Sequence, residues 1–205
     1  MSRLITRIIG FLWRKFSYYL APTWFEKQGI HLARVNNVVL YGLPIVEMAK
    51  GATITIGSRV VLCSRSEYTA LGISRPIIIR AMSSGAHIII GSDVGLSGTT
   101  ICANKKVTIG DSCLIGADVM ICDTDFHPIN PIGRRYGNDE VNSAPVLIER
   151  NVFIGARTII LKGVIIGENS VIGAGSVVTS SIPANCIAAG NPCRVLKQLP
   201  FLNQN

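Results

Sequence analysis

An aliphatic residue returns at every sixth position over a long stretch in the C-terminal part of the chain. The series comprises Ile148, Ile154, Ile160, Ile166, Ile172 and Val178. A mostly small residue follows each member by four positions. An α-helix would spread residues six apart over all its faces, and a hairpin sheet would need turn residues between reversals. The period therefore predicts a prism with three short strands per coil, in which every sixth residue points inward.

The same period appears upstream, with interruptions. Ile109, Ile115 and Ile121 carry it, and Ile56 and Leu62 begin an earlier piece. Between these pieces the residues in phase are Ile78, Ser84, Ile90, Leu96 and Cys102. Residues 109–126 then form one coil and 148–183 form two more, stacked about 4.8 Å apart as parallel strands are. The composition fits a narrow interior, since 48% of residues are hydrophobic but only 6% are aromatic.

Charge and cysteine usage narrow the class of partner and compartment. The chain of 205 residues carries a formal net charge of +8, which indicates anionic partners. It has no zinc-finger spacing, RNP-like aromatic motif or long Lys/Arg run, so we expect no nucleic acid among its partners. Its 6 cysteines contain no C-x-x-C pair, and we interpret them as small, buried, reduced thiols of a cytoplasmic protein.

The N-terminal segment "MSRLITRIIGFLWRKFSYYL" places apolar residues at helical spacing, with arginine and lysine interleaved. No apolar run reaches the roughly 18–20 residues that span a bilayer. The pattern also lacks the longer apolar stretch and cleavage site of a secretory signal. Two interpretations remain open. The helix packs on its own protein or a neighbouring subunit, or it lies in a membrane interface with its basic residues on anionic lipid.

The period breaks at residues 127–147, "HPINPIGRRYGNDEVNSAPVL", where prolines and glycines favour a loop. Long loops on rigid scaffolds are often functional. His127 stands at the root of this loop, and an imidazole suits proton transfer at neutral pH. Its second ring nitrogen needs an acceptor, for which Asp125, Asp123 and a backbone carbonyl are candidates; Asp125 can instead cap the loop. A second excursion, "CSRSEYTALGISRP" at 63–76, has no assigned role.

The repeats resemble those of the hexapeptide-repeat, left-handed parallel β-helix proteins over roughly residues 50–197. The stretch "FIGARTIILKGVIIGENSVIGAGSVVTSSIPANCIAAGNPCRVLKQL" is similar to the maltose, galactoside and nodulation-factor acetyltransferase group, and "DTDFHP" resembles polysaccharide-cluster O-acetyltransferases. The resemblance implies an all-β, left-handed parallel β-helix with an N-terminal helical segment, an excursion loop at 127–147 and a short C-terminal helix. The expected divisions are a helical or extended segment at 1–50, the acyltransferase domain at 51–197 and a tail at 198–205.

The resemblance also implies an activity. We expect an acetyl-CoA-dependent O-acetyltransferase, acting on a sugar or polysaccharide intermediate, that forms a homotrimer with acetyl-CoA in the grooves between prisms. His127 corresponds to the family's general base. We expect direct transfer, because the chain has no G-x-S-x-G elbow and no cysteine beside a partner base. No metal is expected, and the N-terminal helix offers a peripheral contact with the inner membrane face.

Further residues take roles from the resemblance alone. Expected cofactor contacts are Ala156 and Ala174 near the pantetheine arm, Thr179 and Ser180, where relatives often have Thr-Lys, and Arg194 and Lys197 at the CoA phosphates. In "GLSGTTICANKK", Asn104 occupies an acidic acceptor-binding position of galactoside-type relatives, and an asparagine of those relatives is replaced by Leu96 or Ser97. We therefore place the acceptor at Ser97 and Asn104 and disfavour galactoside or maltose.

Three alternatives stay open. An antibiotic-inactivating O-acetyltransferase shares the fold and a histidine near a loop. A γ-type carbonic anhydrase shares the prism but needs three histidine ligands, whereas His31, His87 and His127 contain no closely spaced pair. A non-catalytic prism is the third alternative, against which the His127 loop and the "GNPC" segment argue.

Overall fold

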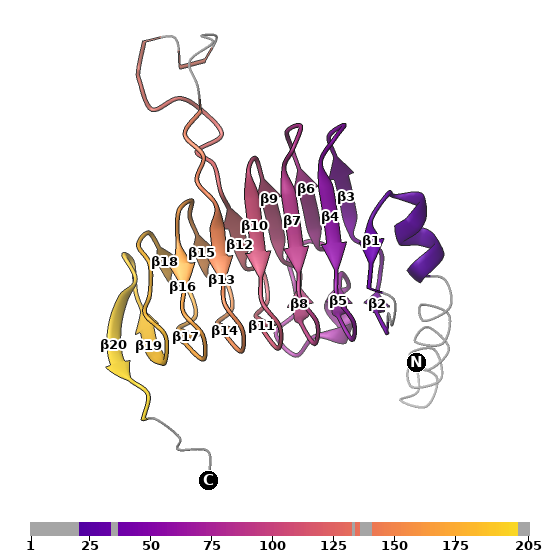
Figure 1. The fold of residues 1–205 in the computed structure, drawn as a ribbon. Coiled ribbons are helices and arrows are strands. Elements are labelled where there is room, and N and C mark those ends of the chain that lie inside the picture. Colours follow the sequence, from indigo (N-terminus) through magenta and orange to yellow (C-terminus); the bar gives the residue numbers. More distant parts are fainter. Residues whose placement is uncertain (1–20, 34–36, 133, 136–140, 201–205) are drawn as a thin grey trace.

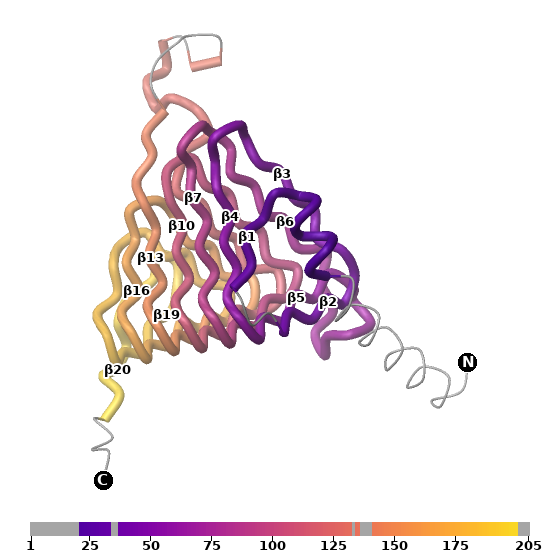
Figure 2. The backbone as a smooth tube through the Cα atoms, turned by 45° about the vertical axis from the view of Figure 1, so that its right-hand side comes forward, coloured from indigo at the N-terminus to yellow at the C-terminus, as the bar shows by residue number. Residues whose placement is uncertain are grey.

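The computed structural model describes residues 21–33, 37–132, 134–135 and 141–200, and its strands wind into a three-sided prism (Figures 1 and 2). Each side is a sheet in which strands from successive coils pair in parallel. We name the sides sheet A, sheet B and sheet C. The chain visits them in that order, so each coil has an A-to-B, a B-to-C and a C-to-A corner.

Sheet A contains β1 (His31–Leu32), β4 (Thr53–Ile56), β7 (His87–Ile90), β10 (Lys106–Ile109), β13 (Val146–Ile148) and β16 (Ile165–Ile166). Sheet B contains β2 (Val39–Tyr41), β5 (Val61–Cys63), β8 (Gly95–Ser97), β11 (Leu114–Ile115), β14 (Phe153–Ile154), β17 (Val171–Ile172), β19 (Cys186–Ala189) and β20 (Arg194–Gln198). Sheet C contains β3 (Ile45–Met48), β6 (Ile78–Ala81), β9 (Thr100–Ala103), β12 (Met120–Cys122), β15 (Ile159–Ile160) and β18 (Val177–Val178).

The six-residue series fills the interior, as predicted. All of its members from Ile148 to Val178 are fully buried. The small residues between them are buried too, and their hydroxyls bond to carbonyls at the corners: Thr158 Oγ1 donates to Gly155 O at 2.8 Å and Ser170 Oγ to Pro183 O at 2.8 Å. Buried polar groups are tolerated when they are hydrogen-bonded in this way.

Backbone contact between coils limits the corners to particular residues. A Cβ at Gly155 would lie 2.4 Å from the backbone nitrogen of Ala174 in the next coil, so only glycine fits. Two positions after Gly155, at the B-to-C corner, stands Arg157. The residues at this position of the corner in four coils are Gly98, Asp118, Arg157 and Gly175, and their φ angles lie between 57° and 69°. This left-handed conformation favours glycine, yet Asp118 and Arg157 adopt it.

Part of the predicted phase is wrong between the two series. Ile78 lies on the outer face of β6 while Ile77 and Ile79 point inward, Ser84 is exposed in a turn, and Cys102 packs outside the core between inward Ile101 and Ala103. Corner lengths depart from the six-residue period here: the excursion precedes β6, five residues separate β6 from β7, and only Gly98 and Thr99 separate β8 from β9.

The ends of the prism also differ from expectation. Strands β1 to β3 belong to the three sheets, so stacking begins upstream of residue 51. The short C-terminal helix is wrong within the described residues: Arg194–Gln198 form β20, which pairs antiparallel with β19. A helix over residues 21–27 covers the N-terminal end with buried Ala21 and Phe25. The helix expected over residues 1–20 lies outside the described residues. In the described part of the chain, no helix has the length and apolar character needed to cross a membrane.

Two excursions interrupt the coils. Residues 64–77, including the 3-10 turn Ser66–Tyr68, leave the B-to-C corner between β5 and β6. Residues 123–145 leave the C-to-A corner between β12 and β13 and rise away from the prism (Figure 1). The second excursion was expected at 127–147; it begins four residues earlier, and β13 resumes the coil at Val146.

Candidate active site

The root of the 123–145 excursion is fixed by a buried carboxylate. Asp123 is 0% exposed, and its Oδ1 accepts a hydrogen bond from Asn104 N at 2.6 Å. Its Oδ2 accepts from Lys105 N at 2.6 Å and Lys106 N at 2.7 Å. The carboxylate thus serves three backbone donors at the neighbouring corner. Asp123 is therefore a structural anchor, and it does not orient His127.

Side-chain hydroxyls tie the two arms of the excursion together above this anchor. Thr124 and Ser143 form an antiparallel bridge, and Ser143 Oγ donates to Thr124 Oγ1 at 2.9 Å. Asn104 Nδ2 donates to Ser143 Oγ at 2.9 Å. Asn104, expected to bind the acceptor, is thus joined to the loop root.

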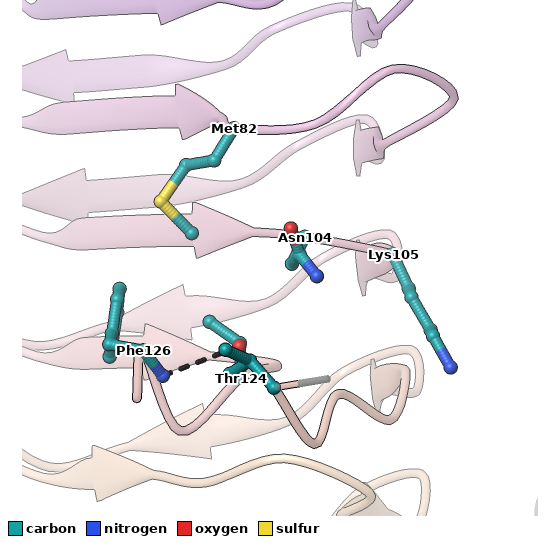
Figure 3. A pocket seen from close by; sticks show the side chains of 6 residues that line it. Met82, Asn104, Lys105, Thr124 and Phe126 are labelled. Carbon is teal, nitrogen blue, oxygen red and sulfur yellow. Dashed lines mark hydrogen bonds between the residues drawn. The ribbon is translucent and has the colours of Figure 1, made fainter. Parts of the chain in front are cut away.

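A hollow of about 420 Å³ opens beside this root, lined by Met82, Asn104, Lys105, Thr124, Phe126 and Val141 (Figure 3). Met82, Asn104 and Phe126 come from three successive coils at the C-to-A corner. Lys105 stands apart from Met82 and Phe126, with its ammonium group directed away from them (Figure 3). The hollow therefore has an apolar side, amide and hydroxyl groups, and one cation at its margin.

His127 directly follows this hollow in the chain. Its side chain is exposed, whereas Pro128 after it is buried and fixes the backbone. No other described residue makes a hydrogen bond or ion pair with its imidazole. The ring is thus accessible to a ligand.

The pairing of His127 with Asp125 is not present. Asp125 Oδ1 instead accepts from Lys162 Nζ at 2.7 Å, with side-chain exposures of 26% and 30%. Asp125 Oδ2 is buried without a partner among the described residues. Lys162 follows β15, one coil further on, so this ion pair fixes the excursion to the prism. Sequence reasoning missed Lys162 because 37 positions separate it from its partner.

The expected site residues divide between two edges of sheet C. His127, Asp125, Asn104, Thr179 and Ser180 lie at the C-to-A edge, and Thr179 and Ser180 are exposed there after β18. The opposite, B-to-C edge holds Ser97, Ala156 and Ala174. The loop before Arg194 also lies at this edge, because Cys193 N donates to Val177 O at 2.8 Å. Lys197 lies on β20 in sheet B. Within one chain, Ser97 and Asn104 therefore lie at opposite edges of sheet C, and so do Ala156 and His127.

The cysteines near the site are poor nucleophiles. Cys122 and Cys102 occupy paired positions in sheet C, and all six cysteines of the chain are buried and free. Burial raises the pKa of both thiols above the ordinary value. A raised pKa lowers the thiolate fraction at neutral pH, which agrees with a mechanism that uses no acyl-cysteine.

The other histidines lie elsewhere. His31 and His87 are on the outer face of sheet A, where His87 Nδ1 is 2.7 Å from Thr53 Oγ1. Among the described residues, no three His, Cys, Asp or Glu side chains gather into a group that could hold a metal ion.

Comparison with known proteins agrees with this architecture. A family model described as the hexapeptide repeat of succinyl-transferase matches residues 106–122 and 145–180. The coils over residues 106–122 and 145–180 are therefore similar to hexapeptide repeats, and the chain folds as a left-handed parallel β-helix. An N-acyltransferase from Bacillus cereus, solved with dTDP-4-amino-4,6-dideoxyglucose and coenzyme A, is similar over 87% of this chain and 89% of its own, with a TM-score of 0.65 and 23% identity. That likeness concerns the fold.

The particular relatives are sugar acetyltransferases. The chain is 45% identical over 118 residues to a galactoside O-acetyltransferase of Escherichia coli, covering 57% of each protein. It is 44% identical over 110 residues to a galactoside O-acetyltransferase of Lactococcus lactis, covering 50% of this chain and 52% of that one. The chain thus matches about half the length of these curated relatives.

Proposed function

We propose that the protein is an acetyl-CoA-dependent O-acetyltransferase that acetylates a hydroxyl of a sugar or polysaccharide intermediate. The observation that carries the proposal is His127, which is exposed, directly follows Phe126 of the hollow's lining, and stands on an anchored loop root. The names of the two galactoside O-acetyltransferase relatives support acetyl transfer.

The proposed chemistry is direct transfer. His127 removes the proton of the acceptor hydroxyl as that oxygen attacks the thioester carbonyl of acetyl-CoA. The C–S bond breaks, and the coenzyme A thiolate leaves and takes the proton from the imidazolium. General base catalysis of this kind contributes about 10²–10⁴-fold. The raised pKa values of the nearby thiols disfavour a route through an acyl-cysteine.

A complete site would need more than one copy of the chain. The proposed donor residues Ala156, Ala174 and Arg194 lie at one edge of sheet C, and His127 lies at the other. A homotrimer places these edges together in the groove between two prisms. The outer face of sheet B supports self-association, because Leu114 and Phe153 stack there in register with 59% and 47% of their area exposed.

The acceptor would enter the hollow at Asn104 and Thr124. Met82 and Phe126 offer an apolar face to a sugar ring, and Asn104 donates through Nδ2 to Ser143 Oγ, which leaves its Oδ1 to accept from a ligand hydroxyl. Among the residues that the structure describes, no carboxylate lines the hollow. This composition disfavours the neutral galactosides bound by an acidic residue in the relatives that the sequence resembles.

Acceptor-dependent release of thiol from acetyl-CoA is the test. Wild type, His127→Ala and the matched control His87→Ala are compared on neutral sugars, nucleotide sugars and hydroxylated antibiotics, with CoA affinity measured separately by calorimetry. We expect turnover with a sugar acceptor, a loss of about 10²-fold or more in His127→Ala with unchanged CoA affinity, and no loss in His87→Ala.

Other outcomes discriminate between the alternatives. Equal turnover in His127→Ala would remove this histidine from the mechanism. Turnover confined to hydroxylated antibiotics would favour the resistance-type enzyme. Absence of CoA binding in the purified protein would favour a non-catalytic prism.

We place the enzyme in the cytoplasm, where acetyl-CoA is available and where free thiols such as these six persist. Peripheral contact of residues 1–20 with anionic lipid remains part of the proposal. Deleting residues 1–20 should then abolish sedimentation with anionic vesicles, and unchanged sedimentation would refute the contact.

A further inference from the structure

A second hollow, of about 300 Å³, lies on the outer face of sheet C under the 64–77 excursion. Its lining consists of Ser74, Arg75, Asp118, Met120, Arg157 and Ile159. Met120 and Ile159 are paired residues of β12 and β15 and form an apolar floor. The two guanidinium groups come from different elements, one from the excursion and one from the B-to-C corner. The sequence of this excursion does not by itself indicate a role.

The two arginines have no ionic partner in the part of the chain that the structure describes. Arg75 Nε is buried and makes no hydrogen bond there. Neither Arg75 nor Arg157 forms an ion pair with a described carboxylate, although five other basic side chains do. Asp118, which also lines the hollow, accepts the single N–H of Ser74, shared between its two oxygens at 3.0 and 3.1 Å, and forms no ion pair with either arginine. A buried guanidinium N–H without an acceptor is costly, so a ligand that accepts this bond would be favoured.

The backbone conformation at Arg157 fixes where its side chain begins. Arg157 has φ of 59° at a corner position that holds Asp118 in the preceding coil and Gly175 in the next. An L-residue in the left-handed region costs about 1 kcal/mol relative to glycine. The left-handed corner also holds the arginine in place, since Arg157 N donates to Ala117 O at 2.7 Å. The corner thus presents the Arg157 side chain to the hollow that it lines.

We infer that this hollow binds a phosphate group of the acceptor substrate. The inference rests on the proposed function and specifies its acceptor class as phosphorylated, as in a nucleotide-linked or lipid-linked sugar. Two guanidinium groups match a phosphate or diphosphate through charge-assisted, bidentate bonds. Ser74 and Asp118 fix the excursion over the site, and the apolar floor supports the neighbouring part of the ligand.

The location separates this hollow from the proposed coenzyme phosphates. Arg194 and Lys197 lie on β20 of sheet B. In that sheet, β17 and β19 separate β20 from β14, the strand that precedes Arg157. On sheet C the separation is shorter, because Cys193 N donates to Val177 O of β18, which pairs with β15. Two strand spacings amount to about 10 Å along the prism. The hollow lies at the coils of β12 and β15, which are also the coils that flank the His127 excursion. In a trimer, the hollow of one copy and His127 of its neighbour occupy the same level of the shared groove.

Binding of inorganic pyrophosphate to the full chain tests the inference without any need for turnover. Calorimetric titrations compare wild type with Arg75→Gln, Arg157→Gln and the double variant. Arg59→Gln is the matched control, because Arg59 also has a left-handed φ, of 54°, at an A-to-B corner and is exposed. We expect affinity to fall about tenfold in each single variant and beyond detection in the double variant, with no change in the control.

Unchanged pyrophosphate affinity in the double variant would overturn the inference. Because Arg75→Gln can disturb the excursion, Arg157→Gln on the rigid corner must show the same loss on its own, and failure of that variant to do so also overturns it. CoA affinity is measured in parallel. A joint loss of CoA affinity would assign the hollow to the donor and refute the acceptor assignment. If the variants lose pyrophosphate binding but the wild-type protein binds no CoA, the hollow is still a phosphate site and the proposed acetyl transfer is refuted.

Discussion

The two excursions leave the same prism but are attached to it differently. Residues 64–77 lie along sheet C and are held at their far end by Asp118, while Tyr68 packs on Tyr41 at a ring distance of 4.8 Å. The described residues of 123–145 rise from the prism and are attached at their root, through Asp123, the Thr124–Ser143 bridge and the Asp125–Lys162 pair (Figure 2). The first can build a preformed hollow, and the second can hold an accessible base.

The largest expected effect concerns the buried anchor of the second excursion. Asp123→Ala removes the acceptor of three backbone N–H groups at a site that is 0% exposed. Each unsatisfied donor costs about 1–3 kcal/mol, so we expect a loss of about 3–5 kcal/mol in the free energy of unfolding. Urea denaturation followed by circular dichroism measures it. A loss below about 1 kcal/mol would mean that water replaces the carboxylate.

The ion pair between the second excursion and the next coil should contribute less. Lys162→Met leaves the half-buried Asp125 carboxylate with neither oxygen paired. The expected destabilisation is about 1–2 kcal/mol, between the values for exposed and buried pairs. If the pair positions His127, kcat falls while the affinity for CoA does not.

Arg150→Met is the matched control for this change. It breaks a pair with Glu168 whose side chains are 67% and 37% exposed, and it should cost less than about 0.5 kcal/mol. Equal losses in the two variants would show that Asp125 and Lys162 are no more coupled than an ordinary surface pair.

The sequence predicted the prism far better than its attachments. The period at Ile148 to Val178 is set by local sterics and burial, so inward residues, corners and the position of the second loop all follow from it. The phase at Ile78 and Ser84 could not follow, because an excursion of arbitrary length precedes them. The partners of Asp123 and Asp125 depend on stacking between coils, which no local pattern encodes.

The residues of the proposed sites divide in the same way. His127 could be singled out because it follows a break in the period and precedes a proline. Arg75 and Arg157 could not, since they are 82 positions apart in the printed numbering and meet only because the excursion folds back over two later coils. The replacement of glycine by Arg157 at a corner was the one available signal.

Loosening the first excursion should leave the prism intact. Asp118→Gly removes the bonds to Ser74 N but places glycine at a corner where Gly98 and Gly175 already occur. Relief of the left-handed strain, about 1 kcal/mol, offsets the lost hydrogen bond, so global stability should change by less than about 0.5 kcal/mol. Limited proteolysis with trypsin should nevertheless cut after Arg65 at least about tenfold faster. Cleavage in 123–145 should not change, and faster cleavage at both sites would indicate global loosening instead.

The smallest expected effect uses the cysteine at the start of each excursion as a reporter. Cys63 and Cys122 are both buried, and burial raises the pKa of each thiol. A raised pKa lowers the thiolate fraction, so iodoacetamide at pH 7.5 should alkylate both at least about tenfold more slowly than a free thiol. In Asp118→Gly, only Cys63 should become more reactive, because its Sγ donates to Arg65 O at 3.3 Å within the loosened segment. Mass spectrometry of the alkylated peptides resolves the two sites, and parallel acceleration of Cys122 would show that the excursions do not open independently.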